Sequence, residues 1–556
     1  MKLMKFYHDD NMFFEPLLLT INSKNQAVFL NDDGISLSDG TKRLLFDETF
    51  KALIALKTKP LFYMIWLDHS ILKVKKYNTD LEEQDSQCYC FNGEMHLVDI
   101  KNVYFDSLEK NLYLVVLTEK NISLEVKITE ELKCTTMKRM KEDDEAAHIE
   151  TISFQNANQL LTTQRPGVGL SAVIVGSEKK WHLDKYHCHY GEYVVFSIEK
   201  EHSEKVVVMN LSTFHIDLKF EFENPIISAK MLDNNRLICL LNKAGHIEMA
   251  VLNILSNKIE KIYSFDTNIE LHVQVFDKIM IKKTSLSDGV SWGYINTDLQ
   301  IEFPASTVNS VDFVNAAYFQ HPVLCILFEP RQKEIQKIII SIHGGPESFE
   351  FDEFRFNGIY REFVYRGVLV CALNYKGSAY RSLKTRKSAW KNWRNVVKEI
   401  LECSQFLEKK YGISRNKITL LGVSFGAALG LLAGKMSNEN FEKIIAIAPL
   451  MNLKSHLNKL DAKELRWFKT RFNRFEINVM FHYKFFQKDH DNAVYLIQGD
   501  NDSVLDYNET LLAYKTARIK NLNWNLFTET DGDHVPTDLN QKKRRYRLIY
   551  QSYFDE

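Results

Sequence analysis

The chain has 556 residues, of which 45% are hydrophobic and 12% aromatic, and it carries 71 lysines and arginines against 72 aspartates and glutamates. At about 150 residues per domain, this length predicts two to four domains, and the composition excludes global disorder, a collagen-like repeat and a coiled-coil rod. The formal net charge of −1 argues against a protein built throughout to neutralise phosphates, so we expect no nucleic-acid partner.

The N-terminus reaches acidic residues before any apolar segment develops, so we expect no secretory signal there. The longest nearly uncharged apolar stretch, 423–434, is shorter than the roughly 20 residues that a membrane-spanning helix needs. Eight cysteines are scattered, apart from the close pair at 88 and 90, and show no disulfide framework. The sequence therefore predicts a cytoplasmic protein with reduced thiols and no membrane partner. It leaves the oligomeric state open, a homo-oligomer included.

Residues 16–310 consist of short β-like runs separated by turn residues. The runs at 26–30 and 35–37, for example, flank Asn31-Asp-Asp-Gly34, which predicts a hairpin. The clearest unit places four strands within 225–263, and a similar unit runs through 193–220. Four strands in roughly 40–45 residues is the period of a β-propeller blade. This region therefore predicts an all-β propeller of about seven blades. No blade motif repeats cleanly, so a pair of stacked β-sandwiches remains the alternative. Residues 1–15 form a separate segment that we expect to pack on the C-terminal domain.

The sequence pattern of residues 311–556 is different, because buried strands alternate with helices. The strands are expected at 337–342, 367–373, 417–421, 444–447 and 493–497, and the helices at 390–411 and 425–436. This alternation predicts an α/β domain whose mostly parallel sheet is covered on both faces. Active sites of such sheets lie at the carboxyl ends of the strands, so the residues just after each strand carry the functional argument.

A Gly-x-Ser-x-Gly motif, Gly422 to Gly426, follows one of these strands and precedes a helix. In this context the motif predicts a nucleophile elbow, which presents the Ser424 hydroxyl and directs the helix N-terminus toward developing negative charge. The alternative is structural, since the glycines would also let a helix pack closely on the sheet.

Two later strands end in residues that complete a catalytic triad. Asp502 follows the strand at 493–497, and His534 lies in an Asp/Gly-rich loop after an edge strand at 524–527. A carboxylate there orients the histidine, which then serves as general base and acid. Asp500 and Asp506 compete with Asp502 for this role. The chain order Ser, Asp, His is that of α/β-hydrolases.

The segment His343-Gly-Gly-Pro346 follows the strand at 337–342. Glycine allows the backbone to approach a substrate closely, so Gly344 or Gly345 is expected to supply an oxyanion-hole N–H beside that of Phe425. A simple glycine turn is the alternative.

Other polar clusters have structural explanations. His187-Cys188-His189 lacks a second ligand cluster nearby, so a surface strand is favoured over a metal site, and we expect no metal and no organic cofactor. Basic residues at 542–545 and Arg547 are expected on the solvated face of the last helix. A basic helix around 461–475 is a second solvated face, with attraction of an acidic peptide as the alternative.

Taken in order, several of these segments resemble the prolyl oligopeptidase family of serine peptidases. They are 341–346, 373–378, 411–418, 422–426, 448–449, 499–502 and 533–534, and the His-Gly-Gly-Pro form is most similar to the acylaminoacyl-peptidase branch. The resemblance covers 311–556 by motif. It implies an N-terminal propeller that limits access, with Ser424 as nucleophile, Asp502 as orienting acid and His534 as base. The elbow departs from the usual family pattern at Phe425 and Ala427, which affects substrate preference more than chemistry.

The favoured function is a serine peptidase that cleaves short peptides through an acyl-enzyme, with a role dedicated to one peptide substrate as an open option. The same triad also permits ester hydrolysis or acyl transfer. The competing class is a propeller-based binding protein whose hydrolase domain is catalytically silent. Cleavage-site preference, endopeptidase or exopeptidase action, gating and biological pathway are not encoded in any motif of the sequence.

Overall fold

The computed structural model describes residues 185–554, with short gaps at 276–277, 355–357, 461, 488–491 and 537–538. Before residue 185 it describes mainly the strands named below. The expectation that residues 1–15 pack on the C-terminal domain lies outside the described residues.

Seven four-stranded antiparallel sheets occupy the described part of residues 17–308, and each is built from four consecutive strands. The first three sheets comprise β1 (Leu17–Ile21), β2 (Ala27–Asn31), β3 (Gly34–Leu37), β4 (Arg43–Leu45); β5 (Phe50–Ala55), β6 (Leu61–Asp68), β7 (Ile71–Asn78), β8 (Glu83–Tyr89); and β9 (Leu97–Asp106), β10 (Asn111–Thr118), β11 (Ser123–Ile128), β12 (Cys134–Arg139). The hairpin predicted from the Asn-Asp-Asp-Gly turn is confirmed, because β2 and β3 pair with Asn31 opposite Gly34.

The other four sheets continue this pattern of hairpin-linked strands. They comprise β13 (His148–Ser153), β14 (Gln159–Arg165), β15 (Gly169–Val175), β16 (Lys180–His182); β17 (Lys185–Tyr190), β18 (Tyr193–Glu199), β19 (Glu204–Asn210), β20 (Ile216–Phe222); β21 (Ile226–Asp233), β22 (Arg236–Lys243), β23 (His246–Asn253), β24 (Lys258–Phe265); and β25 (Asn268–Val275), β26 (Lys278–Ser285), β27 (Gly289–Asn296), β28 (Ile301–Val308). The four-stranded unit predicted at 225–263 coincides with the sheet β21–β24. The similar unit predicted at 193–220 covers β18, β19 and β20, and the sheet begins one strand earlier, with β17.

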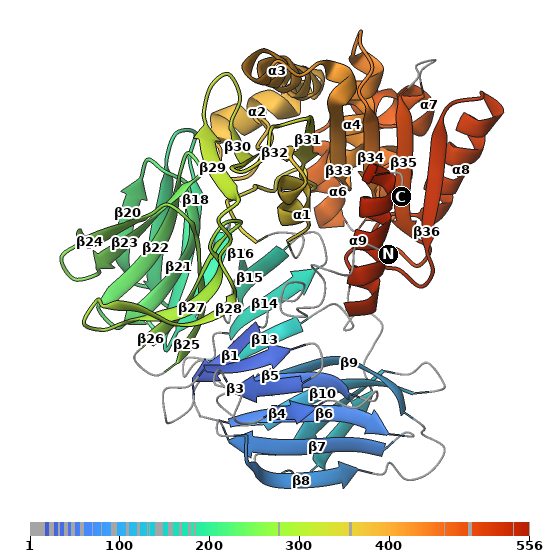
Figure 1. The fold of residues 1–556 in the computed structure, drawn as a ribbon. Coiled ribbons are helices and arrows are strands. Elements are labelled where there is room, and N and C mark those ends of the chain that lie inside the picture. The colour runs from blue at the N-terminus through green and yellow to red at the C-terminus, as the bar shows by residue number, and fades with distance from the viewer. Residues whose placement is uncertain are drawn as a thin grey trace.

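The first strands of successive sheets lie beside one another, as propeller blades require. Such contacts join β5 to β9, β9 to β13, β17 to β21 and β21 to β25, and β1 of the first sheet contacts β25 of the last. Figure 1 shows these sheets below and to one side of the helix-containing domain.

The C-terminal domain is built on one eight-stranded sheet with the order β29-β30-β32-β31-β33-β34-β35-β36. Its strands are β29 (Val314–Phe319), β30 (Cys325–Pro330), β31 (Lys337–Ile342), β32 (Val368–Leu373), β33 (Ile418–Val423), β34 (Lys443–Ile447), β35 (Ala493–Gly499) and β36 (Trp524–Glu529). The pairs from β32 to β36 are parallel, and β29 and β30 are antiparallel. The predicted parallel sheet with β36 at its edge is therefore confirmed.

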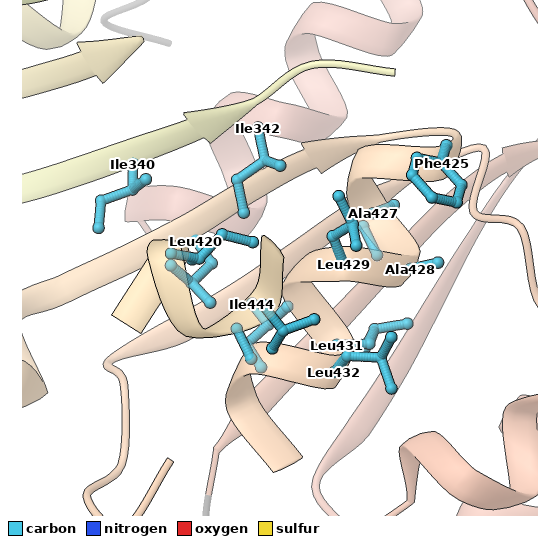
Figure 2. Close-up of a cluster of buried hydrophobic side chains, with 14 of the residues drawn as sticks. Ile340, Ile342, Leu420, Phe425, Ala427, Ala428, Leu429, Leu431, Leu432 and Ile444 are labelled. Atoms are coloured by element: carbon cyan, nitrogen blue, oxygen red, sulfur yellow. The ribbon is translucent and has the colours of Figure 1, made fainter. Parts of the chain in front are cut away.

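Helices cover both faces of this sheet. One face packs on α3 (Arg394–Tyr411), α4 (Phe425–Met436) and α8 (Tyr507–Ile519), and the other packs on α1 (Ile359–Tyr365) and α9 (Leu539–Phe554). Figure 2 shows the first of these cores, in which Ile340, Ile342 and Leu420 of the sheet meet side chains of α4. Alternate residues of each strand enter opposite cores, which explains why the strands read as continuous apolar runs.

The remaining helical segments lie in the connections between these elements. They are α2 (Leu383–Lys391), η5 (Arg415–Lys417), α5 (Leu453–Leu457), α6 (Ala462–Lys469), the π-helix η6 (Glu476–Met480) and α7 (Tyr483–Phe486). None of the helices in the described part of the chain is both long and apolar enough to cross a bilayer.

The helix predicted over 390–411 is wrong at its start, because α2 ends at Lys391 and α3 begins at Arg394. Asn392 is extended, with φ −158°, and the next backbone N–H, that of Trp393, donates to the carboxylate of Glu476 at 2.9 Å. A tertiary hydrogen bond thus replaces the one that would have continued the helix.

Candidate active site

The candidate nucleophile Ser424 sits in the turn between β33 and α4. Its backbone has φ 54° and ψ −115°, a region that L-residues adopt only when the surroundings impose it. The Ser424 N–H donates to the carbonyl of Ile447 at 2.8 Å, which fixes the turn to the end of β34. A half-buried side chain at this position lies at the carboxyl edge of the sheet.

The glycines of the elbow are required by close backbone contacts. A Cβ on Gly426 would lie 2.2 Å from the Ile342 carbonyl oxygen, and a Cβ on Gly422 would lie 2.5 Å from the Gly426 oxygen. Such distances are impossible for a real side chain. The elbow can therefore form only with glycine on both sides, which agrees with the tight turn expected from the motif.

Asp502 lies in the loop after β35, and each of its carboxylate oxygens has two partners. Oδ1 accepts from the N–H groups of Val504 and Leu505 at 2.9 and 2.8 Å. Oδ2 accepts from the Gln498 amide at 3.0 Å and bonds to His534 Nδ1 at 2.9 Å. Burial alone would raise the pKa of Asp502, but these hydrogen bonds, with that to His534 foremost, outweigh it and hold the pKa below its ordinary value.

The protonation of His534 follows from this geometry. An ionised carboxylate only accepts hydrogen bonds, so His534 Nδ1 carries a proton that it donates to Asp502. In the neutral imidazole, Nε2 is then the basic nitrogen. The His534 side chain is 12% exposed and that of Asp502 is fully buried, so the basic nitrogen belongs to a ring with limited access to solvent.

The acid loop (residues 499–505) and the histidine loop (residues 529–534) are tied together by several hydrogen bonds. The Asp533 carboxylate accepts from the N–H and the hydroxyl of Ser503, at 2.9 and 2.7 Å, and from the N–H of His534 at 2.6 Å. The Asn501 N–H donates to the Gly532 carbonyl at 3.1 Å. Burial raises the pKa of Asp533, but its hydrogen bonds lower the pKa by a larger amount, so the net shift is downward.

The candidate oxyanion loop lies against the serine. A Cβ placed on Gly344 would lie 3.3 Å from Ser424 Cβ, and Gly345 has φ +128°, a conformation that favours glycine. Tyr375 supports this loop: its hydroxyl, with a single proton to donate, lies 3.3, 3.3 and 3.0 Å from the carbonyl oxygens of His343, Gly344 and Pro346, and Pro346 is the nearest acceptor. Phe425 follows Ser424 directly and is the first residue of α4.

The structure thus joins Asp502 to His534 and places Gly344 beside Ser424. Among the hydrogen bonds of the described residues there is none between the Ser424 hydroxyl and His534. Catalytic hydrogen bonds of this kind are often long before substrate binds. The competing aspartates are occupied elsewhere, because Asp506 caps α8 and pairs with Lys459 at 2.7 Å, and Asp500 accepts from the Asp531 N–H.

A second histidine, His456 of α5, lies near the candidate triad. Burial lowers its pKa, the nearby His534 lowers it further, and Asp502 acts in the opposite direction. His456 also packs edge-on against Phe468, with ring centroids 5.5 Å apart. No sequence motif pointed to this residue, because its relation to the site exists only through the packing of α5.

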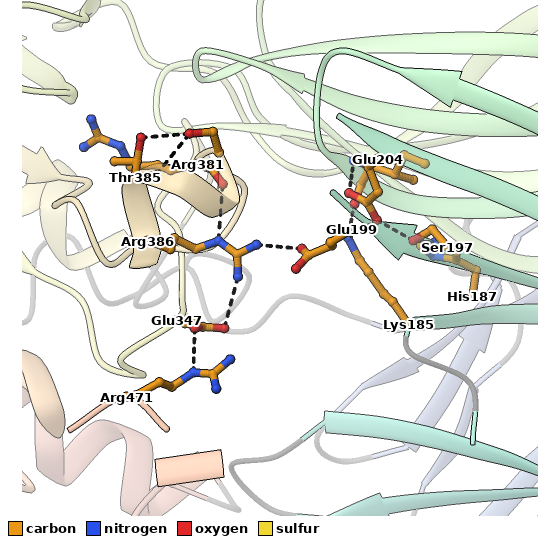
Figure 3. Close-up of polar contacts among 12 residues, drawn as sticks. Lys185, His187, Ser197, Glu199, Glu204, Glu347, Arg381, Thr385, Arg386 and Arg471 are labelled. Atoms are coloured by element: carbon orange, nitrogen blue, oxygen red, sulfur yellow. Dashed lines mark hydrogen bonds and ion pairs between the residues drawn. The ribbon is translucent and has the colours of Figure 1, made fainter. Parts of the chain in front are cut away.

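The residue after the oxyanion loop, Glu347, connects that loop to the propeller side. Figure 3 shows its carboxylate between Arg471, at 2.8 Å, and Arg386, at 3.3 Å, while Arg386 also pairs with Glu199 of β18 at 2.7 Å. Arg471 is further held over the rings of Trp390 and Trp467, each 4.0 Å from its guanidinium. The sequence interpretation of Arg471 as part of a solvated basic face is therefore wrong, although Arg466, Lys469 and Arg474 are exposed.

Two further interpretations need correction. His187 and His189 lie on β17 as expected of a strand, but the strand is half-buried, and each imidazole has a partner, Ser197 at 3.0 Å and Tyr186 at 3.1 Å. Arg545 was expected on the solvated face of the last helix, yet its side chain is 7% exposed and pairs with Glu529. No group of three or more residues suited to hold a metal occurs in the described part of the chain.

The C-terminal part of the chain is similar to a known protein family. Residues 354–556 match the model of the prolyl oligopeptidase family. None of the curated proteins matches the chain by sequence.

Solved structures resemble the chain over nearly its whole length. The acylaminoacyl peptidase of Pyrococcus horikoshii shares 11% identity over 96% of this chain and 93% of that one, with a TM-score of 0.69. A puromycin-hydrolysing peptidase of Mycobacterium tuberculosis shares 13% over 98% and 95%, with a TM-score of 0.68, and oligopeptidase B of Leishmania major shares 10% over 99% and 89%, with a TM-score of 0.68. At such identities the likeness establishes the fold, a propeller joined to an α/β-hydrolase domain. The family match lies within the C-terminal domain, at residues 354–556, and this part of the chain is similar to the prolyl oligopeptidase family.

Proposed function

We propose that the protein hydrolyses short peptides with Ser424 as nucleophile, His534 as general base and acid, and Asp502 as the residue that orients His534. The observation that carries this proposal is the 2.9 Å bond between His534 Nδ1 and Asp502 Oδ2 at the carboxyl edge of the sheet that also presents Ser424. The family match supports peptides as the substrate class.

The reaction follows from the tautomer of His534. Its basic Nε2 takes the hydroxyl proton as Ser424 Oγ attacks the peptide carbonyl carbon, and Asp502 stabilises the imidazolium that forms. The negative charge on the carbonyl oxygen is bound by the N–H of Phe425 and one from Gly344 or Gly345. Nε2 then protonates the leaving amine, which departs and leaves an acyl-enzyme. Water, deprotonated by the same nitrogen, attacks the ester and releases the acid.

The proposed domain arrangement restricts access to this site. We propose a hydrolase domain at 311–556 and, at 16–310, a propeller whose seven sheets close into a ring through the β1–β25 contact. Its sheets approach the hydrolase at the Glu199–Arg386 pair. A propeller in this place favours short, flexible peptides over folded proteins. A related acylaminoacyl peptidase has been solved with a peptide-like chloromethyl ketone, Z-Gly-Gly-Phe. Reduced thiols, as in the five free cysteines of the described residues, support a cytoplasmic setting.

The test is the intact mass of the full chain after treatment with a fluorophosphonate, which phosphonylates activated serines. We expect one adduct on the wild type and none on Ser424→Ala, with unchanged circular dichroism. Equal labelling of both proteins would place the nucleophile elsewhere. A folded wild type that stays unlabelled would support the silent binding protein instead.

A further inference from the structure

Arg545 of α9 contacts the histidine loop of the candidate site. Its Nη1 donates to the carbonyl of His534 and its Nη2 to that of Asp533, both at 2.6 Å, and its Nε donates to the Glu529 carboxylate at 2.8 Å. The side chains of Arg545 and Glu529 are 7% and 1% exposed. One buried guanidinium therefore bonds to the first residue of the histidine loop and to the last two.

This arrangement constrains the orientation of the His534 backbone. A guanidinium is planar and its donors have a fixed geometry, so bonding two successive carbonyls sets the directions of the two peptide groups on either side of the His534 Cα. The Asp533 carboxylate in turn accepts from Ser503 and from the His534 N–H. The histidine loop is thus held both by α9 and by the acid loop.

We propose that Arg545 is a positioning residue, which sets the orientation of the His534 imidazole toward Asp502 and Ser424 by holding the two loop carbonyls. The inference rests on the proposed function for its kinetic consequences and on the geometry alone for its spectroscopic ones. Neighbouring arginines of the same helix do not share the role, because Arg544 and Arg547 are exposed.

The kinetic test compares Arg545→Met and Arg545→Lys with Arg544→Met, which removes an exposed arginine from the adjacent position. We expect Arg545→Met to lower kcat on a short chromogenic peptide by roughly 10- to 100-fold, the scale of a small misplacement of a catalytic group, with KM changed less than about threefold. Arg545→Lys should be intermediate, since an ammonium keeps the charge but not the planar geometry. Arg544→Met should match the wild type. Equal kcat for Arg545→Met and Arg544→Met would overturn the proposal.

The double variant Arg545→Met/Glu529→Met separates positioning from charge neutralisation. Arg545→Met alone leaves Glu529 buried without its cation, a cause of misfolding in itself, whereas replacing both partners by apolar side chains often preserves a fold. The proposal expects the loss of kcat to persist in the double variant, because the carbonyls stay unheld. Recovery of wild-type kcat would show that Arg545 only neutralises Glu529.

A readout independent of turnover distinguishes failure of this inference from failure of the proposed function. The proton between His534 Nδ1 and Asp502 gives a downfield proton resonance, assigned by its loss in His534→Ala. We expect that resonance to shift or broaden in both Arg545 variants and to stay unchanged in Arg544→Met. An unchanged resonance in Arg545→Met would overturn the inference whether or not the wild type hydrolyses peptides.

Discussion

Asp502 and His534 are joined by a hydrogen bond, and both oxygens of the Asp502 carboxylate accept hydrogen bonds. Oδ1 is occupied by the N–H groups of Val504 and Leu505, so only Oδ2 is available to His534. The loop backbone therefore determines which oxygen faces the histidine. It would also determine how an asparagine at this position is oriented.

Asp502→Asn should lower kcat by about 10⁴-fold, as expected when a triad histidine is held in the wrong tautomer. The two backbone N–H groups need an acceptor, so the asparagine oxygen takes the place of Oδ1 and its amide nitrogen faces His534. Nδ1 must then accept, and the proton moves to Nε2. The measurement is kcat on a short peptide. Asp506→Asn is the matched control, because asparagine also caps helices well, and a similar loss in that variant would contradict the assignment of the acid.

Gly426→Ala should destabilise the C-terminal domain by at least about 3 kcal/mol, at the upper end of the cost of overpacking. The new methyl would lie 2.2 and 2.3 Å from two backbone oxygens, those of Ile342 and His343, and backbone cannot move aside as a flexible side chain can.

Gly430→Ala in the same helix is its control. There the nearest atom, a methyl carbon of Ile342, lies 3.6 Å from the added carbon. Alanine is the better helix former by about 1 kcal/mol, so this variant should be neutral or more stable. Thermal unfolding compares the two, and equal melting temperatures would contradict the close packing of the elbow.

Asp352 should make the stability of the chain fall as the pH rises from about 4 to about 6. Burial raises the pKa of this carboxyl from 3.8 to about 6, Asp288 adds to the rise, and the Leu286 N–H, Tyr318 and Arg361 oppose it. The folded state then holds the proton more tightly than the unfolded state, so protonation stabilises the fold at low pH and that stabilisation is lost through pH 6.

Asp352→Asn should remove this pH dependence. Above pH 6 the variant should be more stable by up to about 3 kcal/mol, at roughly 1.4 kcal/mol per pKa unit, because asparagine keeps the acceptor for the Leu286 N–H at 2.8 Å. Melting temperatures between pH 4 and 7 test this, with the exposed Asp298→Asn as control. Parallel curves for wild type and Asp352→Asn would disprove it.

Arg386→Met should weaken the contact between the propeller and the hydrolase domain. Arg386 is the cation shared by Glu199 of β18 and Glu347 beside the oxyanion loop (Figure 3), and its removal leaves Glu347 with Arg471 alone. We expect a larger radius of gyration by small-angle X-ray scattering and a lower kcat/KM. Lys387→Met, an exposed neighbour on α2, should change neither. Scattering profiles that coincide would exclude Arg386 as an interdomain link.

The sequence predicted those features that follow from short-range pattern. The alternation of apolar strands and helices indicated the parallel sheet, and the Gly-x-Ser-x-Gly motif indicated a turn that only glycine permits at Gly422 and Gly426. The hairpin at β2 and β3 was encoded by its turn residues. Each of these features is marked by residues close together in the sequence, so it could be predicted before the tertiary contacts that explain it, such as those around Gly426, were known.

The features that sequence reasoning missed depend on contacts between distant segments. In the sequence Arg545 is one of five basic residues in the last helix, and only the packing of α9 against the histidine loop distinguishes it from Arg544. In the sequence Arg471 is part of a basic helix, but in the structure its guanidinium bonds to the carboxylate of Glu347, 124 positions away. The helix is likewise interrupted before α3 because the Glu476 carboxylate accepts a hydrogen bond from the Trp393 N–H.

The contact between Gly499 and Gly532 limits how this site can diversify. A Cβ on Gly499 would lie 1.9 Å from the Gly532 carbonyl oxygen, so the acid loop and the histidine loop fit together as a pair with no room for a side chain between them. Insertions or bulky substitutions in one loop would have to be matched by a change in the other. Libraries aimed at new peptide substrates should therefore leave 499–505 and 529–534 fixed and vary the exposed positions around α5, α6 and the propeller face, where a change at one position does not require a simultaneous change at another.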